Sequence, residues 1–163
     1  AFPPMVGYAA VTGSITWDSV ILFLIIFMWT PPHFWALALY KTIDYDKAGI
    51  PMMPNVAGAK STRLQIFIYA LVLAGVCALP LFTGLGGPLY GVIALLLNAG
   101  FVFLAYRVWQ SRAGERPVEA DERSLYEVKA GDKAARNLFA FSLFYLFAMF
   151  VAIAIEHALK LYG

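Results

Sequence analysis

Charged residues are scarce in this sequence. Aspartate, glutamate, lysine and arginine together make up 13% of its 163 residues, whereas 61% are hydrophobic. A soluble domain carries about 25% charged residues, so the composition excludes an ordinary water-soluble domain and indicates a protein that lies in the lipid bilayer. The net charge is only +2, and we expect no nucleic-acid partner.

Other features are also missing. The chain has one cysteine, Cys77, and therefore no internal disulfide; we expect a small buried thiol. The first residues, AFPPMVGYAA, contain neither an initiator methionine nor the basic segment that opens a signal peptide. They start abruptly with a Pro-Pro turn, which suggests a fragment of a longer chain.

Long hydrophobic runs dominate what is present. Four apolar stretches have close to the roughly 20 residues that a helix needs to cross a bilayer: 19–40, 64–82, 88–109 and 137–155. In lipid, only helices and closed barrels satisfy their own backbone. We therefore predict an all-α, multi-pass transmembrane bundle of four helices, with a glycine-rich turn at 83–87 between the middle two.

The basic residues are unevenly placed. Segment 41–63 holds four lysines and arginines, segment 107–136 holds seven, and the turn at 83–87 holds none. The positive-inside rule therefore places both long segments in the cytoplasm. We expect the membrane to be the plasma (inner) membrane. For 107–136 we expect a solvated segment with a short surface helix around 124–130.

Two prolines interrupt the first apolar stretch. Pro31 and Pro32 remove two backbone donors and crowd the carbonyls four residues back, which predicts a break in the helix. His33 follows, about 21 Å into the membrane if the helix begins at Ser19. An ionisable group inside the membrane is a functional hypothesis; the alternative is a structural histidine that caps a freed carbonyl.

Carboxylates follow directly after this helix. Asp44 and Asp46 lie among basic residues, a composition that suits a Mg²⁺ ion holding a phosphate, because Mg²⁺ takes one or two carboxylates plus phosphate oxygens. The alternative is an ordinary charged loop. The cations available to neutralise the remaining phosphate charge are Lys41, Lys47, Lys60 and Arg63.

Several motifs together resemble a known family. The stretches PPMVGYAAVTG (3–13), WTPPHFWALAL (29–39), DYDKAGIPMMPNVAG (44–58) and DKAARNLFAFSLFYL (132–146) resemble the protohaem IX farnesyltransferases, or haem O synthases. These are UbiA-type intramembrane prenyltransferases of about nine helices.

The resemblance implies where this chain belongs in such an enzyme. Residues 1–163 would be the carboxyl-terminal part of a single integral-membrane prenyltransferase domain, helices six to nine, with the second of two Asp-rich loops at 44–49. The first Asp-rich motif is absent from these residues, so we expect the chain alone to be inactive. A D-x-x-x-D spacing would place the second carboxylate at Ala48, which makes Asp46 a less secure metal ligand than Asp44.

The resemblance also implies a reaction. A farnesyl group passes from farnesyl diphosphate to a vinyl group of haem B, with Mg²⁺ on the diphosphate, and the product haem O feeds haem A and terminal-oxidase biogenesis, with a haem A synthase as a partner. We expect His33 to contact the haem or remove a proton, and Lys133 and Arg136 to pair with the haem propionates. The predicted catalytic residues are Asp44, His33 and Lys41. The predicted substrate-binding residues are Tyr45, Phe34, Trp35, Arg63 and Arg136.

Other readings remain open. One is a UbiA-type prenyltransferase acting on quinones, and another is a non-enzymatic membrane module that binds or transports haem. A b-type cytochrome is disfavoured because its two axial histidines must lie at one depth, whereas His157 lies beyond the fourth apolar stretch, on the side opposite His33.

Overall fold

The structure is a computed structural model that describes residues 1–116 and 122–162, with side chains as far as residue 159. Within these residues the chain is built from helices and contains no strand. The four long helices are α2 (Trp17–Tyr40), α5 (Ala59–Val76), α7 (Pro88–Trp109) and α8 (Glu122–Tyr162). The short helices are α1 (Pro3–Thr12), α3 (Thr42–Lys47), α4 (Met53–Ala57) and α6 (Leu79–Thr83).

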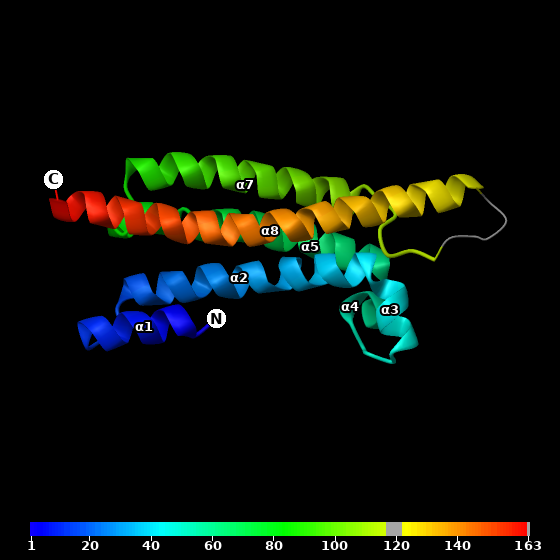
Figure 1. The fold of residues 1–163 in the computed structure, drawn as a ribbon, viewed down its shortest axis with the longest axis horizontal. Coiled ribbons are helices and arrows are strands. Elements are labelled where there is room, and N and C mark those ends of the chain that lie inside the picture. Colours follow the sequence, from blue (N-terminus) through cyan, green and yellow to red (C-terminus); the bar gives the residue numbers. More distant parts are fainter. Residues whose placement is uncertain (117–121, 163) are drawn as a thin grey trace.

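The four long helices lie side by side and alternate in direction (Figure 1). Helix α2 packs against α5 and α8, and α7 packs against the same two helices, so the four form a closed ring. The helical segments 17–40, 59–83, 88–109 and 122–159 are each long and apolar enough to cross a membrane. The predicted all-α, multi-pass bundle is thereby confirmed.

Small side chains hold the helices close together. Alanines at the contacts, such as Ala36, Ala70 and Ala135, are completely or almost completely buried and allow the backbones to approach, as is typical of intramembrane helix packing. Helices α7 and α8 also share a partly buried polar contact, in which the Tyr145 hydroxyl donates to Asn98 Oδ1 at 2.7 Å. Cys77 is buried and free, as expected.

The predicted break at the prolines does not occur. Helix α2 runs without interruption through Pro31 and Pro32. Intramembrane helices tolerate proline where neighbouring helices and Ser or Thr side chains support the backbone. Here Pro32 is buried and α5 and α8 flank the helix. Thr30 Oγ1 donates to the carbonyl of Ile26 at 2.7 Å, next to the two carbonyls that the prolines leave without an amide donor.

The expected surface helix around 124–130 is also wrong as a separate element, because these residues form the first turns of α8. Segment 111–115 packs against them and keeps them folded. Gly131 makes this possible, since a Cβ there would overlap the backbone of Ala113. The Gly114 N–H also donates to Asp132 Oδ1 at 3.0 Å. Part of the predicted cytoplasmic segment, 117–121, lies outside the described residues.

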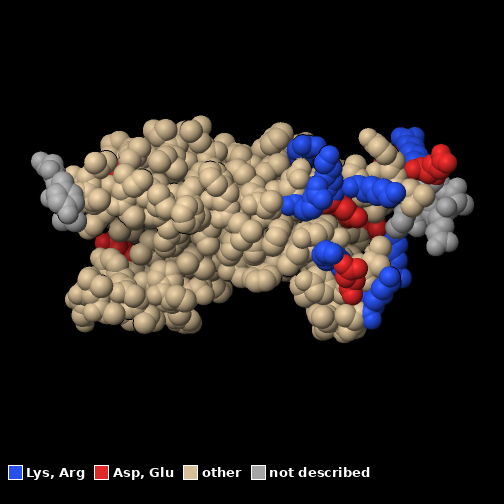
Figure 2. All heavy atoms as spheres, viewed as in Figure 1, with Lys and Arg blue, Asp and Glu red and all other residues tan. Residues whose placement is uncertain are grey.

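Charge is concentrated at one end of the bundle. Figure 2 shows the lysines and arginines gathered where α2 ends, α3 and α4 lie and α8 begins, while the rest of the visible surface is almost free of charge. The carboxyl end lies at the opposite end, and α1 folds back along the start of α2 (Figure 1). The predicted Pro-Pro turn is the first turn of α1.

Candidate functional site

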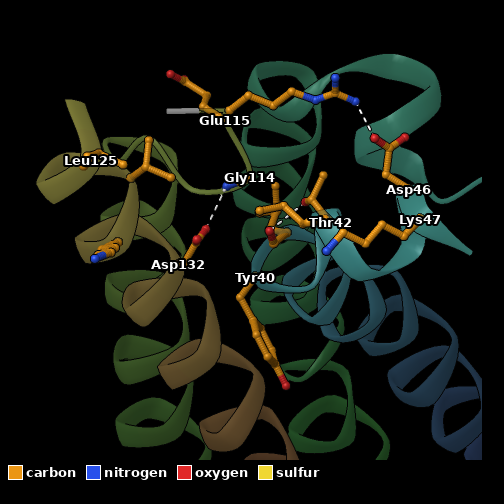
Figure 3. Close-up of a pocket in the computed structure, with 13 residues that line it drawn as sticks. Tyr40, Thr42, Asp46, Lys47, Gly114, Glu115, Leu125 and Asp132 are labelled. Carbon is orange, nitrogen blue, oxygen red and sulfur yellow. Dashed lines mark hydrogen bonds and ion pairs between the residues drawn. The ribbon is translucent and has the colours of Figure 1, made fainter. Parts of the chain in front are cut away.

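A cavity of about 600 Å³ opens at the charged end. Its walls are the end of α2, α3, residues 114–116 and the first turns of α8 (Figure 3). Helix α2 gives way to α3 within one residue, Lys41. At this corner Thr42 Oγ1 lies 2.8 and 2.7 Å from the carbonyl oxygens of Ala38 and Leu39, which fixes the direction of α3.

Asp46 and Lys47 both line the cavity. The Asp46 carboxylate accepts a hydrogen bond from the Arg116 guanidinium across the mouth of the cavity (Figure 3). This pair links α3 to the segment that precedes α8. The carboxylate of Asp46 is therefore already neutralised by a cation of the chain.

Asp44 lies on the same short helix but outside the cavity lining. Its carboxylate accepts a hydrogen bond from Lys41 Nζ at 2.8 Å, and its side chain is 63% exposed. The hydrogen bond and charge of Lys41 hold the pKa of Asp44 below its usual value. Asp44 is thus an ionised, accessible carboxylate at the charged rim.

The two aspartates do not converge on one point. Residues two apart on a helix face different directions, and Asp44 and Asp46 have separate cationic partners. In the part of the chain that the structure describes, no three His, Cys, Asp or Glu side chains form a group able to hold a metal. Since Mg²⁺ needs only one or two carboxylates when phosphate supplies further oxygens, Asp44 fits such an ion.

Arg63 has a different position from the one expected of a phosphate ligand. It is only 5% exposed and lies in α5. Its Nη1 donates to the carbonyl of Ala113 and its Nη2 to Glu115 Oε1, both at 2.7 Å. Arg63 therefore ties α5 to the segment that walls the cavity.

His33 is on α2 and contacts α8. It is only 7% exposed. Its ring stacks between Trp29 and Phe139, at centroid distances of 4.2 and 4.7 Å. Its Nδ1 lies 2.6 Å from Ser142 Oγ, and Ser142 Oγ is also 2.6 Å from the carbonyl of Phe139, to which it donates. Ser142 has one proton for these two partners; with that proton directed to the Phe139 carbonyl, His33 Nδ1 is the donor to Ser142 and Nε2 carries the lone pair.

The predicted aromatic residues do not gather around one point. Phe34 is 49% exposed and touches His33 with its edge, whereas Trp35 packs edge-on against Tyr69 of α5. Tyr45 is half-buried on α3. Of Phe34, Trp35 and Tyr45, Phe34 has a ring contact with His33.

Arg136 lines a second cavity of about 290 Å³ beside the first. Its other lining residues are Tyr40, Lys129, Asp132 and Lys133. Sequence reasoning missed Tyr40 and Lys129, although Lys129 is four residues before Lys133 on a helix. It also missed Ser142, because a single serine in an apolar stretch gives no signal of a functional role.

The chain is similar in sequence to known proteins. The sequence model of the UbiA prenyltransferase family matches residues 1–126, and the chain belongs to this family. Its similarity is to proteins named protoheme IX farnesyltransferase. The relative from Maricaulis maris is 57% identical over 162 residues, which cover 99% of this chain and 49% of the relative. The relative from Caulobacter vibrioides is 53% identical over 160 residues, covering 94% and 48%.

A third relative, protoheme IX farnesyltransferase 2 of Mesorhizobium japonicum, is 53% identical over 167 residues, which cover all of this chain and 49% of that protein. The chain thus spans about half the length of the curated relatives it matches. No solved structure matches the chain significantly.

Proposed function

We propose that this chain is the carboxyl-terminal part, helices six to nine, of an enzyme that transfers a farnesyl group from farnesyl diphosphate to a vinyl group of haem B to give haem O. The observation that carries the proposal is the 49–57% identity, over nearly the whole chain, to proteins named protoheme IX farnesyltransferase. The cavity at the charged end of an otherwise apolar bundle supports it, because both substrates combine an anionic group with a large apolar body.

The reaction breaks the C–O bond of the farnesyl diphosphate, and the diphosphate leaves with the electron pair. The farnesyl C1 bonds to the terminal vinyl carbon, water adds to the carbon next to the ring, and a proton is released. The diphosphate leaves readily only if its developing charge is neutralised. Lys41 at the rim and Lys47 in the cavity lining supply positive charge for this.

Mg²⁺ is the metal we assign to the diphosphate, and Asp44 is the residue that would hold it. When bound, the ion acts as a Lewis acid on the leaving group. Asp46 would contribute only by giving up its ion pair with Arg116. Tyr45 and Phe34 are proposed to face the allylic group, since aromatic rings stabilise a nearby cation.

His33 is proposed to contact the haem. Its Nδ1 is held by Ser142, so Nε2 is the atom free to meet the iron or to accept the released proton. The site lies about seven residues, or roughly 10 Å, from the end of α2, a depth at which the macrocycle can enter from the bilayer. Which of the two roles His33 performs decides whether its replacement changes the haem spectrum or only the rate.

We place the protein in the plasma membrane, and the positive-inside rule orients its charged end to the cytoplasm. There its product would pass to a haem A synthase. The second candidate function is prenylation of a quinone. It is favoured only by the family assignment, and it would leave haem B unchanged.

The test is haem extraction and chromatography from cells that lack haem O synthase. They express either this chain alone or this chain joined to the amino-terminal half of the Maricaulis maris relative. We expect haem O only from the joined protein. Haem O from neither protein, with both present in the membrane, contradicts the assigned reaction, and prenylated quinone instead would support the second candidate.

A further inference from the structure

Helices α2 and α8 meet along a seam that changes character with depth. At the charged end the seam begins with the cavity formed by Lys129, Lys133, Arg136 and Tyr40. Deeper in the bundle, a second cavity of about 310 Å³ opens on the same two helices. It has an apolar lining of Ile26, Trp29, Leu143, Leu146, Phe147 and Phe150.

Helical spacing puts both cavities on the same faces. Lys129, Lys133 and Arg136 are four and three residues apart, and residues so spaced share one helix face. Leu143 and Phe150 follow at seven and fourteen residues after Arg136 and continue that face.

The facing side of the seam, on α2, has the same spacing. His33 and Ile26 lie seven and fourteen residues before Tyr40. Phe139 of α8 contacts residues of the facing side at two depths, with its ring 6.1 Å from that of Tyr40 and 4.7 Å from that of His33. The α2–α8 seam, defined by these residues, extends over about 21 Å of the two helices.

The head of the seam, which is the cavity lined by Tyr40, Lys129, Asp132, Lys133 and Arg136, has a net positive charge. Four carboxylates at this end of the bundle are already paired with other cations: Asp44, Asp46, Glu115 and Glu127. Among the residues that the structure describes, no carboxylate forms an ion pair with Lys129, Lys133 or Arg136. Asp132 faces both charged-end cavities, but its Oδ1 accepts the Gly114 N–H. Three cations and one carboxylate leave the head with a charge of about +2.

Cations are expected at the cytoplasmic rim of any membrane helix, so their presence alone indicates nothing. These three differ in lining a cavity and in standing on the one face of α8 that continues into an apolar groove. An anionic head followed by an apolar body matches this order of charge and depth.

We propose that the α2–α8 seam binds an amphiphile, with its anionic head on Lys129, Lys133, Arg136 and the Tyr40 hydroxyl, and its apolar body alongside His33 and Trp29. The inference rests on the proposed function, in which the two carboxylates of haem B match the surplus charge. The diphosphate of the donor and the phosphate of a lipid share this chemistry, and the experiment separates them.

The test measures haem binding to the chain in phosphatidylcholine nanodiscs, by Soret absorbance, for protohaem and for its dimethyl ester. The wild-type chain is compared with the double variant Lys133→Gln/Arg136→Gln. The control is Lys60→Gln/Arg107→Gln, which removes the same two residue types from the first turn of α5 and the last turn of α7. Empty nanodiscs correct for haem that dissolves in lipid.

We expect the wild-type chain to bind the free acid about tenfold more tightly than the ester, since each exposed cation adds a modest share. The double variant should lose this preference and the control should keep it. Farnesyl diphosphate, but not farnesol, displacing haem from the wild type alone would support the site and assign its head to the donor. A loss of haem affinity in phosphatidylglycerol nanodiscs, absent from the double variant, would support it with a lipid phosphate as the occupant.

Equal affinity for acid and ester, or an equal loss in the control, overturns the inference, as does the absence of any haem binding. The proposed reaction is judged separately, on the joined protein. If that protein makes no haem O but keeps its preference for the free acid, the reaction is wrong and the anion site stands. If it makes haem O without any such preference, the reaction stands and the seam is not the site.

Discussion

Asp44 is the residue on which the metal assignment depends. Asp44→Asn in the joined protein keeps the size of the side chain but removes its charge. We expect haem O formation to fall by at least about 100-fold, while haem binding stays close to that of the wild type. Asp18→Asn, at the opposite end of the bundle, is the matched control. Undiminished haem O formation by Asp44→Asn would show that this carboxylate holds no essential metal.

The effect of Lys41 on the pKa of Asp44 can be measured in the pH–rate profile. Because Lys41 lowers the pKa of Asp44, the carboxylate stays ionised until the pH falls below its usual pKa. Lys41→Gln removes the hydrogen bond, so the pKa of Asp44 rises towards the ordinary value. The acid limb of the pH–rate profile should then move to higher pH relative to its own plateau. An acid limb that stays in place would separate Asp44 from the rate-limiting ionisation.

Ser142 is the hydrogen-bond partner of His33 Nδ1, and a test of its role is the tautomer of that ring. In the wild type we expect ¹⁵N spectra to show a protonated Nδ1 and an unprotonated Nε2, since Ser142 Oγ accepts from Nδ1. Ser142→Ala should release the tautomer and destabilise the bundle by about 1 kcal/mol. Ser14→Ala, in an exposed turn, should do neither. A wild-type His33 with its proton on Nε2 would contradict this assignment.

Sequence reasoning at the residue scale succeeded where the signal was local. Cys77 was correctly expected to be buried, whereas the roles expected of Asp44, Asp46 and His33 stay predictions. It failed for contacts between distant residues. Ser142 lies 109 positions from His33 and Glu115 lies 52 from Arg63, and neither pairing leaves a trace in the spacing of a single sequence.

At the scale of elements, the buried Arg63 holds the segment before α8 against α5. Arg63→Met keeps the apolar stem but removes both hydrogen bonds. We expect it to lower the free energy of unfolding by about 2 kcal/mol, measured by denaturation in mixed micelles, with Lys60→Met as the control. If Arg63 instead binds phosphate, the variant will keep its stability and lose only turnover.

The stability contributed by the Arg63–Glu115 ion pair should fall at low pH. Burial by itself raises the pKa of Glu115, but the hydrogen bonds from Arg112 and Arg63 outweigh it, and the pKa lies below its usual value. The stabilisation is therefore complete above the ordinary carboxyl pKa and is lost as the pH falls through the lowered one. Arg63→Met should flatten this acid loss of stability.

Elements also show why the helix boundaries were harder to predict than the spans. The apolar runs fixed the position of 88–109, where prediction and structure coincide. The start of α8 was missed because its first turns are charged. They are helical because segment 111–115 packs on Gly131 and Asp132, a tertiary contact that local composition does not reveal. The predicted break at the prolines in α2 was wrong for the same reason, since support from neighbouring helices outweighs the local preference of proline.

At the scale of the whole molecule, the lysines and arginines in view gather at one end of the bundle, and the four spans alternate in direction. This polarity makes the topology testable with single cysteines, because the native Cys77 is completely buried and should not react. We expect a membrane-impermeant maleimide to label Gln110→Cys only in inside-out vesicles and Thr83→Cys only in intact spheroplasts. Cys77→Ser should leave both patterns unchanged, while labelling of both positions from one side would contradict the four-span topology.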